Sequence, residues 1–201
     1  MRKNNLLSAL EERVTGQHVL LSGLLPALLL TALAMAILAG SALAATTNLV
    51  KNGSFEKDGD HDGVPNMWNG VNLTPADKRT CKQSKPGNCS FTMVGDGTNK
   101  VLLQDIFISG SALDEFDFSA WTKGKSIVYG AGEVVVYVQI NYTDGDSNGW
   151  YLYIPVGTSP WTLRQIHVVS PKDYDSIQIF LSIFSDSGKA WVDGVKLIPA
   201  P

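Results

Sequence analysis

The sequence contains few of the residues from which catalytic sites are usually built. Only three histidines occur in 201 residues, at positions 18, 61 and 167, and neither His61 nor His167 belongs to an H-E-x-x-H pattern. Two carboxylates that face one bond would be enough for a glycosidase. The acidic residues, however, gather in turns, where solvated carboxylates are the ordinary case. The sequence therefore predicts a protein that is not an enzyme.

Basic residues and cysteines are also scarce. Sixteen Lys and Arg against 19 Asp and Glu give a net charge of -3, and no basic patch is present, which disfavours nucleic acid as a partner. Cys81 and Cys89 are the only cysteines. An even pair in an exported chain predicts a disulfide, and the turn pair Pro86-Gly87 between them indicates that it closes a hairpin or a surface loop.

The N-terminal 44 residues differ in composition from the rest of the chain. Val19–Ala39 is almost wholly apolar and lies between three basic residues and an A-x-A motif at Ala42-Leu43-Ala44. This pattern predicts a signal peptide that is cleaved after Ala44, although the apolar run is also long enough for an uncleaved membrane anchor. In both cases residues 45–201 form one exported domain, which is secreted or held at the extracellular surface. A membrane contact is expected only if the anchor remains.

Strand patterns separated by turn clusters fill the exported part, without a convincing helical period. The clearest strand is Glu133–Tyr142, in which apolar residues alternate strictly. The expected strands are 49–55, 67–73, 90–94, 100–108, 115–122, 133–142, 150–154, 161–169, 175–184 and 189–198. This pattern predicts an all-β fold, a two-sheet antiparallel β-sandwich of the jelly-roll type.

An acid-rich turn follows the first expected strand. Asp58, Asp60 and Asp62 alternate and Gly63 follows them, which is the first half of the D-x-D-x-D-G calcium loop. The twelfth position is Asn69 rather than a bidentate glutamate, and no helices flank the turn. Two interpretations follow from this half-motif, a calcium site and a solvated acidic turn.

Several short motifs together resemble one family. NLVKNGSFE occupies 48–56, Pro65 and Trp68 follow it, FSAWTKG occupies 118–124, and AWVDGVKL occupies 190–197. In this order and spacing the chain is similar to the carbohydrate-binding modules of the galactose-binding-like superfamily, of the type found as accessory domains of cellulases and xylanases. The resemblance covers essentially all of residues 48–201.

The resemblance implies a jelly roll whose first and last strands lie close together, with a structural calcium ion between them. Glu56 matches the carboxylate of the first strand and Asp193 that of the last. The family often has two consecutive acids at the second place, whereas Gly194 follows Asp193 here. The alternative is that the two carboxylates cap strand ends or pair with Lys51 and Lys196.

Sugar binding needs aromatic faces beside polar groups, and the family implies that the ligand lies across a concave sheet. Neighbouring strands also offer Tyr151 and Tyr153. The candidate ligand-binding residues are Tyr137, Gln139, Asn141, Arg164, Gln178 and Phe180. The resemblance implies a non-catalytic module that binds a polysaccharide or a cell-surface glycan. The alternative is an extracellular structural or adhesive protein that uses the same fold for protein contacts.

Overall fold

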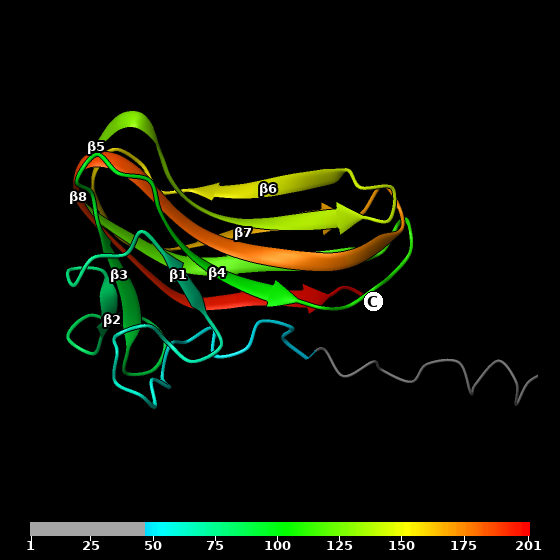
Figure 1. Ribbon diagram of the computed structural model, residues 1–201, viewed down its shortest axis with the longest axis horizontal. Coiled ribbons are helices and arrows are strands. Elements are labelled where there is room, and N and C mark those ends of the chain that lie inside the picture. The colour runs from blue at the N-terminus through cyan, green and yellow to red at the C-terminus, as the bar shows by residue number, and fades with distance from the viewer. Residues whose placement is uncertain (1–46) are drawn as a thin grey trace, which may run out of the picture. The chain divides into compact units, whose positions relative to one another are not determined.

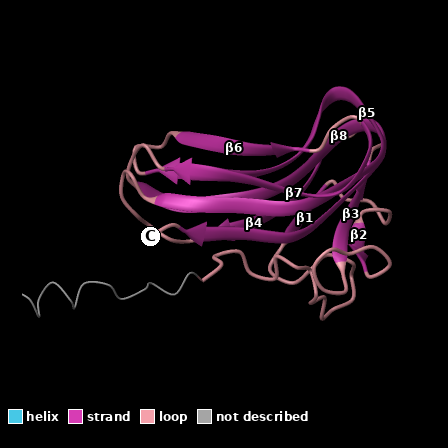
Figure 2. Cartoon of the chain, turned by 180° about the vertical axis from the view of Figure 1, so that it is seen from behind, coloured by secondary structure: helices cyan, strands magenta, loops and turns pink. Residues whose placement is uncertain are grey.

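The structure, a computed structural model, describes residues 47–201, so the predicted signal peptide lies outside the described residues. Residues 45–201 form one compact unit, and the described part has its own hydrophobic core (Figure 1). Every regular element in residues 47–201 is a β-strand (Figure 2), and no helix there could cross a membrane. The strands are β1 (Asn69–Val71), β2 (Lys78–Thr80), β3 (Ser90–Val94), β4 (Lys100–Ile106), β5 (Glu115–Tyr142), β6 (Ser147–Tyr153), β7 (Gly157–Val169) and β8 (Tyr174–Pro199).

Two long strands bend the antiparallel sheet into two layers. β5 has 28 residues and β8 has 26, and they pair along most of their lengths. The register between them shifts repeatedly between Lys125 and Val134, because extra residues in one strand let both strands turn there. Figure 1 shows the two ribbons turning together at one end of the unit.

Each long strand therefore contributes one half to each layer. Layer 1 contains, in order, β1, β4, the first half of β8, the second half of β5 and β6. Layer 2 contains β2, β3, the second half of β8, the first half of β5 and β7. The predicted all-β sandwich is confirmed, with the difference that the layers are continuous through β5 and β8.

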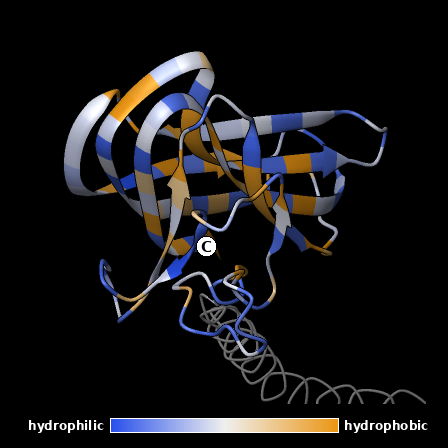
Figure 3. Cartoon of the chain, turned by 60° about the vertical axis from the view of Figure 1, so that its left-hand side comes forward, coloured by the Kyte–Doolittle hydropathy of each residue, from blue (hydrophilic) through white to orange (hydrophobic). Residues whose placement is uncertain are grey.

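The core lies between the two layers. Val136, Val138 and Ile140 of β5 and Ile177 and Ile179 of β8 are fully buried, as their alternation predicts. Buried and accessible residues alternate along both strands, and Figure 3 shows the corresponding alternation of hydrophobic and hydrophilic segments. The alternate residues of layer 1 consequently form an outward face.

Two of the expected strands are wrong or shortened. Residues 49–55 form bends and turns, because Asn52 and Phe55 have φ angles of 49° and 55°, far from the extended region. The segment still lies beside β8, where the Leu49 amide donates to the Leu197 carbonyl over 2.9 Å. The strand expected at 67–73 shrinks to β1, since Met67 and Asn72 have φ angles of 75° and 56° and limit it on both sides.

The other strands occur close to their expected ranges. β3 has the expected bounds, and β4, β6 and β7 differ by a few residues at one or both ends. The expected pairs 115–122 with 133–142 and 175–184 with 189–198 are continuous strands, because the chain passes from one layer to the other without leaving the sheet. The polar stretch expected as loop from 74 to 88 contains β2, which pairs with β3.

Candidate functional site

A row of aromatic side chains crosses the outward face of layer 1. The rings of Tyr137 on β5 and Phe180 on β8 stack with their centroids 4.5 Å apart and their planes 7° apart. Tyr151 on β6 stacks on the other side of Tyr137 at 5.1 Å, and Tyr153 lies 6.0 Å beyond Tyr151. Tyr151 and Tyr153 are 45% and 46% exposed, so the row is open to solvent at its β6 end.

A row of amides lies beside the aromatic row on the same face. Gln139 of β5 pairs with Gln178 of β8, which pairs in turn with Asp105 of β4. Gln178 Nε2 donates to Asp105 Oδ1 over 2.7 Å. Asn141 donates to Ser176 and Gln178, and Gln139 Nε2 donates to Asn141 Oδ1 over 2.8 Å. We call the two rows together the aromatic–amide face.

Asp105 is a member of this face that the sequence analysis missed. Alternation along β4 would have placed Asp105 outward with Val101 and Leu103, because Lys100, Leu102 and Ile106 are buried. The alternation does not show which residues lie opposite Asp105, since this depends on the pairing of β4 with β8. The carboxylate orients the amide of Gln178, because only the Nε2 end of that side chain can donate to it.

Five of the six predicted ligand-binding residues share the aromatic–amide face, and Arg164 does not. Arg164 lies on β7 in layer 2, where its Nε donates to Thr122 Oγ1 over 2.9 Å. Thr122 is only 1% exposed, so Arg164 points toward the space between the layers rather than outward. The sequence could not separate these residues, because strand neighbours in the chain need not share a layer.

One segment matches a catalytic spacing without its structural context. Gly145-Asp146-Ser147-Asn148-Gly149 fits the G-x-S-x-G pattern. A nucleophile elbow needs a sharp turn from a strand into a helix. This segment instead joins β5 to β6 in an antiparallel hairpin, with Ser147 opposite Asn141. The pattern is therefore part of a hairpin and not a nucleophile elbow.

The acid-rich turn brings three carboxylates together. Asp58, Asp60 and Asp62 each offer an oxygen within 4.8 Å of the other two. Oδ1 of Asp58 is buried and has no hydrogen-bond partner in the described part of the chain. Gly63, with a φ angle of 92°, allows the sharp turn that the spacing requires. Clustered carboxylates with an unsatisfied buried oxygen fit a hard cation such as Ca²⁺.

Glu56 and Asp193 also lie in one corner, but amide groups occupy their carboxylates. Asp193 is fully buried and accepts from the amides of Lys85 and Gly194 over 2.7 and 2.6 Å. Glu56 Oε1 accepts from the amides of Asn88 and Cys89 over 2.8 and 3.1 Å. Burial raises the pKa of Asp193 to about 7; the Glu56 carboxylate adds to this shift, and the two amides oppose it.

The loop that supplies three of these four amides is closed by the predicted disulfide between Cys81 and Cys89. Arg79 Nε and Nη2 donate to the main-chain carbonyls of Phe55 and Glu56 over 2.6 and 2.8 Å. A side chain at Gly194 would lie 2.9 Å from Pro86 Cγ of the loop, which explains the absence of a second acid there. Three of the four carboxylate oxygens here accept from N–H groups, which disfavours a cation at this corner. The assignment of Glu56 and Asp193 to a calcium site stays a prediction.

No protein-family profile and no curated protein sequence matches the chain. The fold, however, occurs in solved structures. TmCBM61 in complex with β-1,4-galactotriose aligns over 77% of this chain and 99% of its own, with a TM-score of 0.55 and 16% identity. The second family 16 carbohydrate-binding module aligns over 75% and 99%, with a TM-score of 0.58 and 18% identity.

The same fold also occurs within a larger protein. The enzymatically active domain of tailspike protein 4 from bacteriophage CBA120 aligns over 76% of this chain but only 21% of its own, with a TM-score of 0.55 and 18% identity. Identities this low show a shared fold and no more. The resemblance expected from the sequence is confirmed at that level: residues 47–201 have the β-sandwich fold of carbohydrate-binding modules.

Proposed function

We propose that residues 45–201 form an exported, non-catalytic module that binds a polysaccharide through the aromatic–amide face. The observation that carries this proposal is the outward position of Tyr137, Phe180, Gln139, Gln178 and Asn141 on adjacent strands of layer 1. Apolar rings beside convergent amides are the groups that sugar recognition requires. The shared fold with carbohydrate-binding modules supports the proposal.

The chemistry of the face suits hydroxyl groups. Each amide carries donors and acceptors, and the internal hydrogen bonds occupy only some of them. Gln139, for example, donates through Nε2, and its Oε1 accepts no hydrogen bond from residues 47–201, so it can accept from a hydroxyl. The rings of Tyr137 and Phe180 cover one another, so their edges are the parts that a ligand on the face would meet.

Affinity electrophoresis of residues 45–201 against neutral polysaccharides tests this proposal. Gln178→Ala removes the central amide of the face, and Gln165→Ala removes an exposed amide from β7 in layer 2 as the matched control. The wild type and Gln165→Ala should be retarded by at least one polysaccharide, and Gln178→Ala should not. Equal retardation of both variants would place binding elsewhere on the domain.

A structural calcium ion is a second part of the proposal. We propose that Asp58, Asp60 and Asp62 hold it, supported by their convergence and by the unpartnered Oδ1 of Asp58. A cation that binds only the native state raises stability, by about 2.7 kcal/mol at a hundred times its dissociation constant. Added Ca²⁺ should therefore raise the midpoint of thermal unfolding in the wild type and not in Asp60→Asn. The same rise in both would exclude this turn as the site.

Export is the third part of the proposal. The Cys81–Cys89 disulfide is present in the structure, and such bridges persist in oxidising compartments. Its loop also donates a hydrogen bond to the buried Asp193. Thiol labelling of the protein recovered from its native source should find both cysteines blocked until reductant is added.

A further inference from the structure

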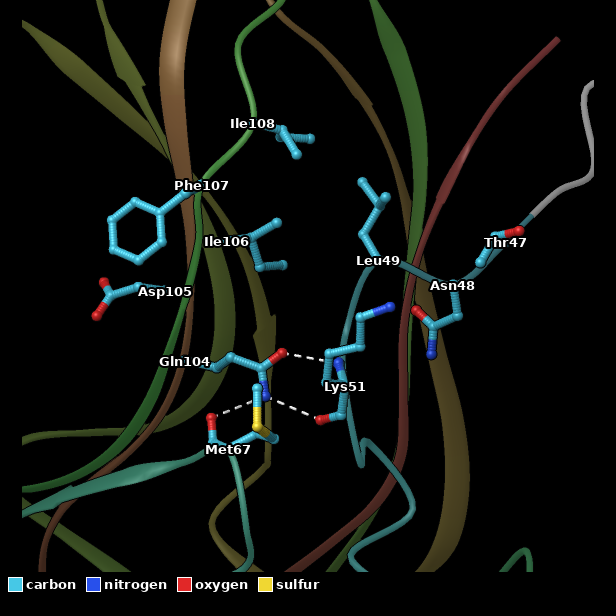
Figure 4. A pocket seen from close by; sticks show the side chains of 10 residues that line it. All are labelled: Thr47, Asn48, Leu49, Lys51, Met67, Gln104, Asp105, Ile106, Phe107 and Ile108. Atoms are coloured by element: carbon cyan, nitrogen blue, oxygen red, sulfur yellow. Dashed lines mark hydrogen bonds between the residues drawn. The ribbon is translucent and has the colours of Figure 1, made fainter.

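Phe107 extends the outward face of layer 1 beyond the end of β4. Residues two apart in a strand point the same way, and Val101, Leu103 and Asp105 point outward. In Figure 4, Phe107 points to the same side of the backbone as Asp105, whereas Ile106 and Ile108 point to the other side. Phe107 is 85% exposed, the largest exposed fraction among the described large hydrophobic residues.

The ring faces of Phe107 are free, unlike those in the aromatic row. Tyr137 is covered by Phe180 on one side and by Tyr151 on the other. A ring face that contacts another ring cannot also contact a sugar. No aromatic partner of Phe107 occurs among residues 47–201. Met67, which is 66% exposed, lines the same pocket of about 350 Å³ together with Lys51 and Gln104 (Figure 4).

Asp105 lies between Phe107 and the aromatic row. Leu103 pairs with Phe180, Asp105 follows two residues later on β4, and Phe107 lies one residue past the end of that strand. Four residues of extended chain span about 13 Å, which is more than one sugar ring. A ligand that contacts both Phe180 and Phe107 must therefore be an oligosaccharide, and it must pass the Asp105 carboxylate.

Asp105 brings a formal charge into the amide row, next to Gln178 and Gln139. The residues opposite it or beside it on β8 and β5 are amides, hydroxyls and aromatic or apolar groups. Its Oδ1 already accepts from Gln178, and no lysine or arginine of the paired strands faces it. A carboxylate or sulfate on a sugar that passes this position would meet a like charge at short distance.

We propose that the glycan face has two platforms, the aromatic row and Phe107, and that Asp105 between them restricts it to uncharged oligosaccharide chains. This inference rests on the proposed function and names the class of ligand for the same face. Phe107 provides the stacking surface. Asp105 orients Gln178 and excludes acidic sugars.

The first test removes the second platform. Phe107→Ala should not affect folding, because the ring is exposed, and Leu163→Ala on the outward side of layer 2 is the matched control. The affinities for a hexasaccharide and a disaccharide of the neutral polymer that the domain binds are measured by calorimetry. Phe107→Ala should lower the affinity for the hexasaccharide by about threefold to tenfold and leave the affinity for the disaccharide unchanged. An unchanged hexasaccharide affinity, or an equal loss for both lengths, would overturn the second platform.

The second test concerns charge. Galactan, galactomannan and hydroxyethyl cellulose are each compared with the same polymer oxidised to carboxylate at its primary hydroxyls. The wild type should bind the oxidised form at least about fivefold more weakly, and Asp105→Asn should reduce this difference. Equal or tighter binding of the oxidised form would overturn the inference while leaving glycan binding intact. Retention on none of the neutral polymers would instead contradict the proposed function, and the inference with it.

Discussion

Opening the Cys81–Cys89 disulfide should destabilise the domain through both the unfolded and the native state. The bridge closes a loop with a sequence separation of 8, and closure of so short a loop stabilises by about 2.5 kcal/mol through chain entropy. The loop amides also bind Glu56 and the buried Asp193, and hydrogen bonds to charged groups contribute about 1.5–3 kcal/mol each. Cys81→Ala/Cys89→Ala should therefore lose at least about 2.5 kcal/mol of unfolding free energy.

Urea unfolding of the double variant and of the reduced wild type measures this loss. For a domain of this size it corresponds to a fall of roughly 5–10 °C in melting temperature. The pH dependence gives a second readout. Because burial raises the pKa of Asp193 from 3.8 to about 7, the native state keeps a proton that the unfolded state releases. This contribution to stability is complete below about pH 4 and disappears as the pH rises through about 7.

If the loop no longer covers Asp193 in the double variant, the decline of stability between pH 4 and pH 7 should become shallower. A variant with unchanged stability and an unchanged pH profile would contradict the role assigned to the loop. A loss of stability with an unchanged profile would indicate that the bridge acts on the unfolded chain alone.

Three further substitutions have defined outcomes. Lys100→Met should cost about 3 kcal/mol in urea unfolding, because it leaves the buried Asp77 without the ammonium group 3.0 Å away. Hydrogen bonds to Asp117 and then to Glu115 raise the pKa of His167, against the effect of desolvation. The stabilisation from protonated His167 is therefore complete below about pH 6.5 and is lost as the pH rises through the raised pKa. An NMR titration should show that this pKa falls in Asp117→Asn. Gly194→Ala should destabilise by more than about 1 kcal/mol in thermal unfolding, because its φ is 56° and a new Cβ would lie 2.9 Å from the disulfide loop. Wild-type behaviour of any of these variants would contradict the contact on which that prediction depends.

The sequence predicted the faces of strands better than their partners. Strict alternation along Glu133–Tyr142 placed Val136 inward and Tyr137 outward, as the structure has them. Alternation is a local property, so it survives without knowledge of the neighbours. The layer to which a strand belongs depends on non-local pairing, and Arg164 was grouped with the wrong layer for this reason.

Backbone geometry and loop contacts were the other limits of the sequence analysis. The strand expected at 49–55 contains two positive φ angles, at Asn52 and Phe55, and of these two residues only Asn52 is of a type that favours one. The pair Glu56 and Asp193 was correctly placed in one corner by the family resemblance. Four amides from residues 85, 88, 89 and 194 bind these carboxylates, and no sequence pattern specifies such main-chain contacts.

The central claim is that the aromatic–amide face of layer 1 binds a glycan. Titration of the ¹⁵N-labelled domain with an oligosaccharide of the polymer that retards it in electrophoresis tests this claim most directly. The side-chain amides of Gln139, Asn141 and Gln178 should show the largest chemical-shift changes, and those of Gln165 in layer 2 should not move. Changes confined to layer 2, or spread evenly over the domain, would contradict the claim.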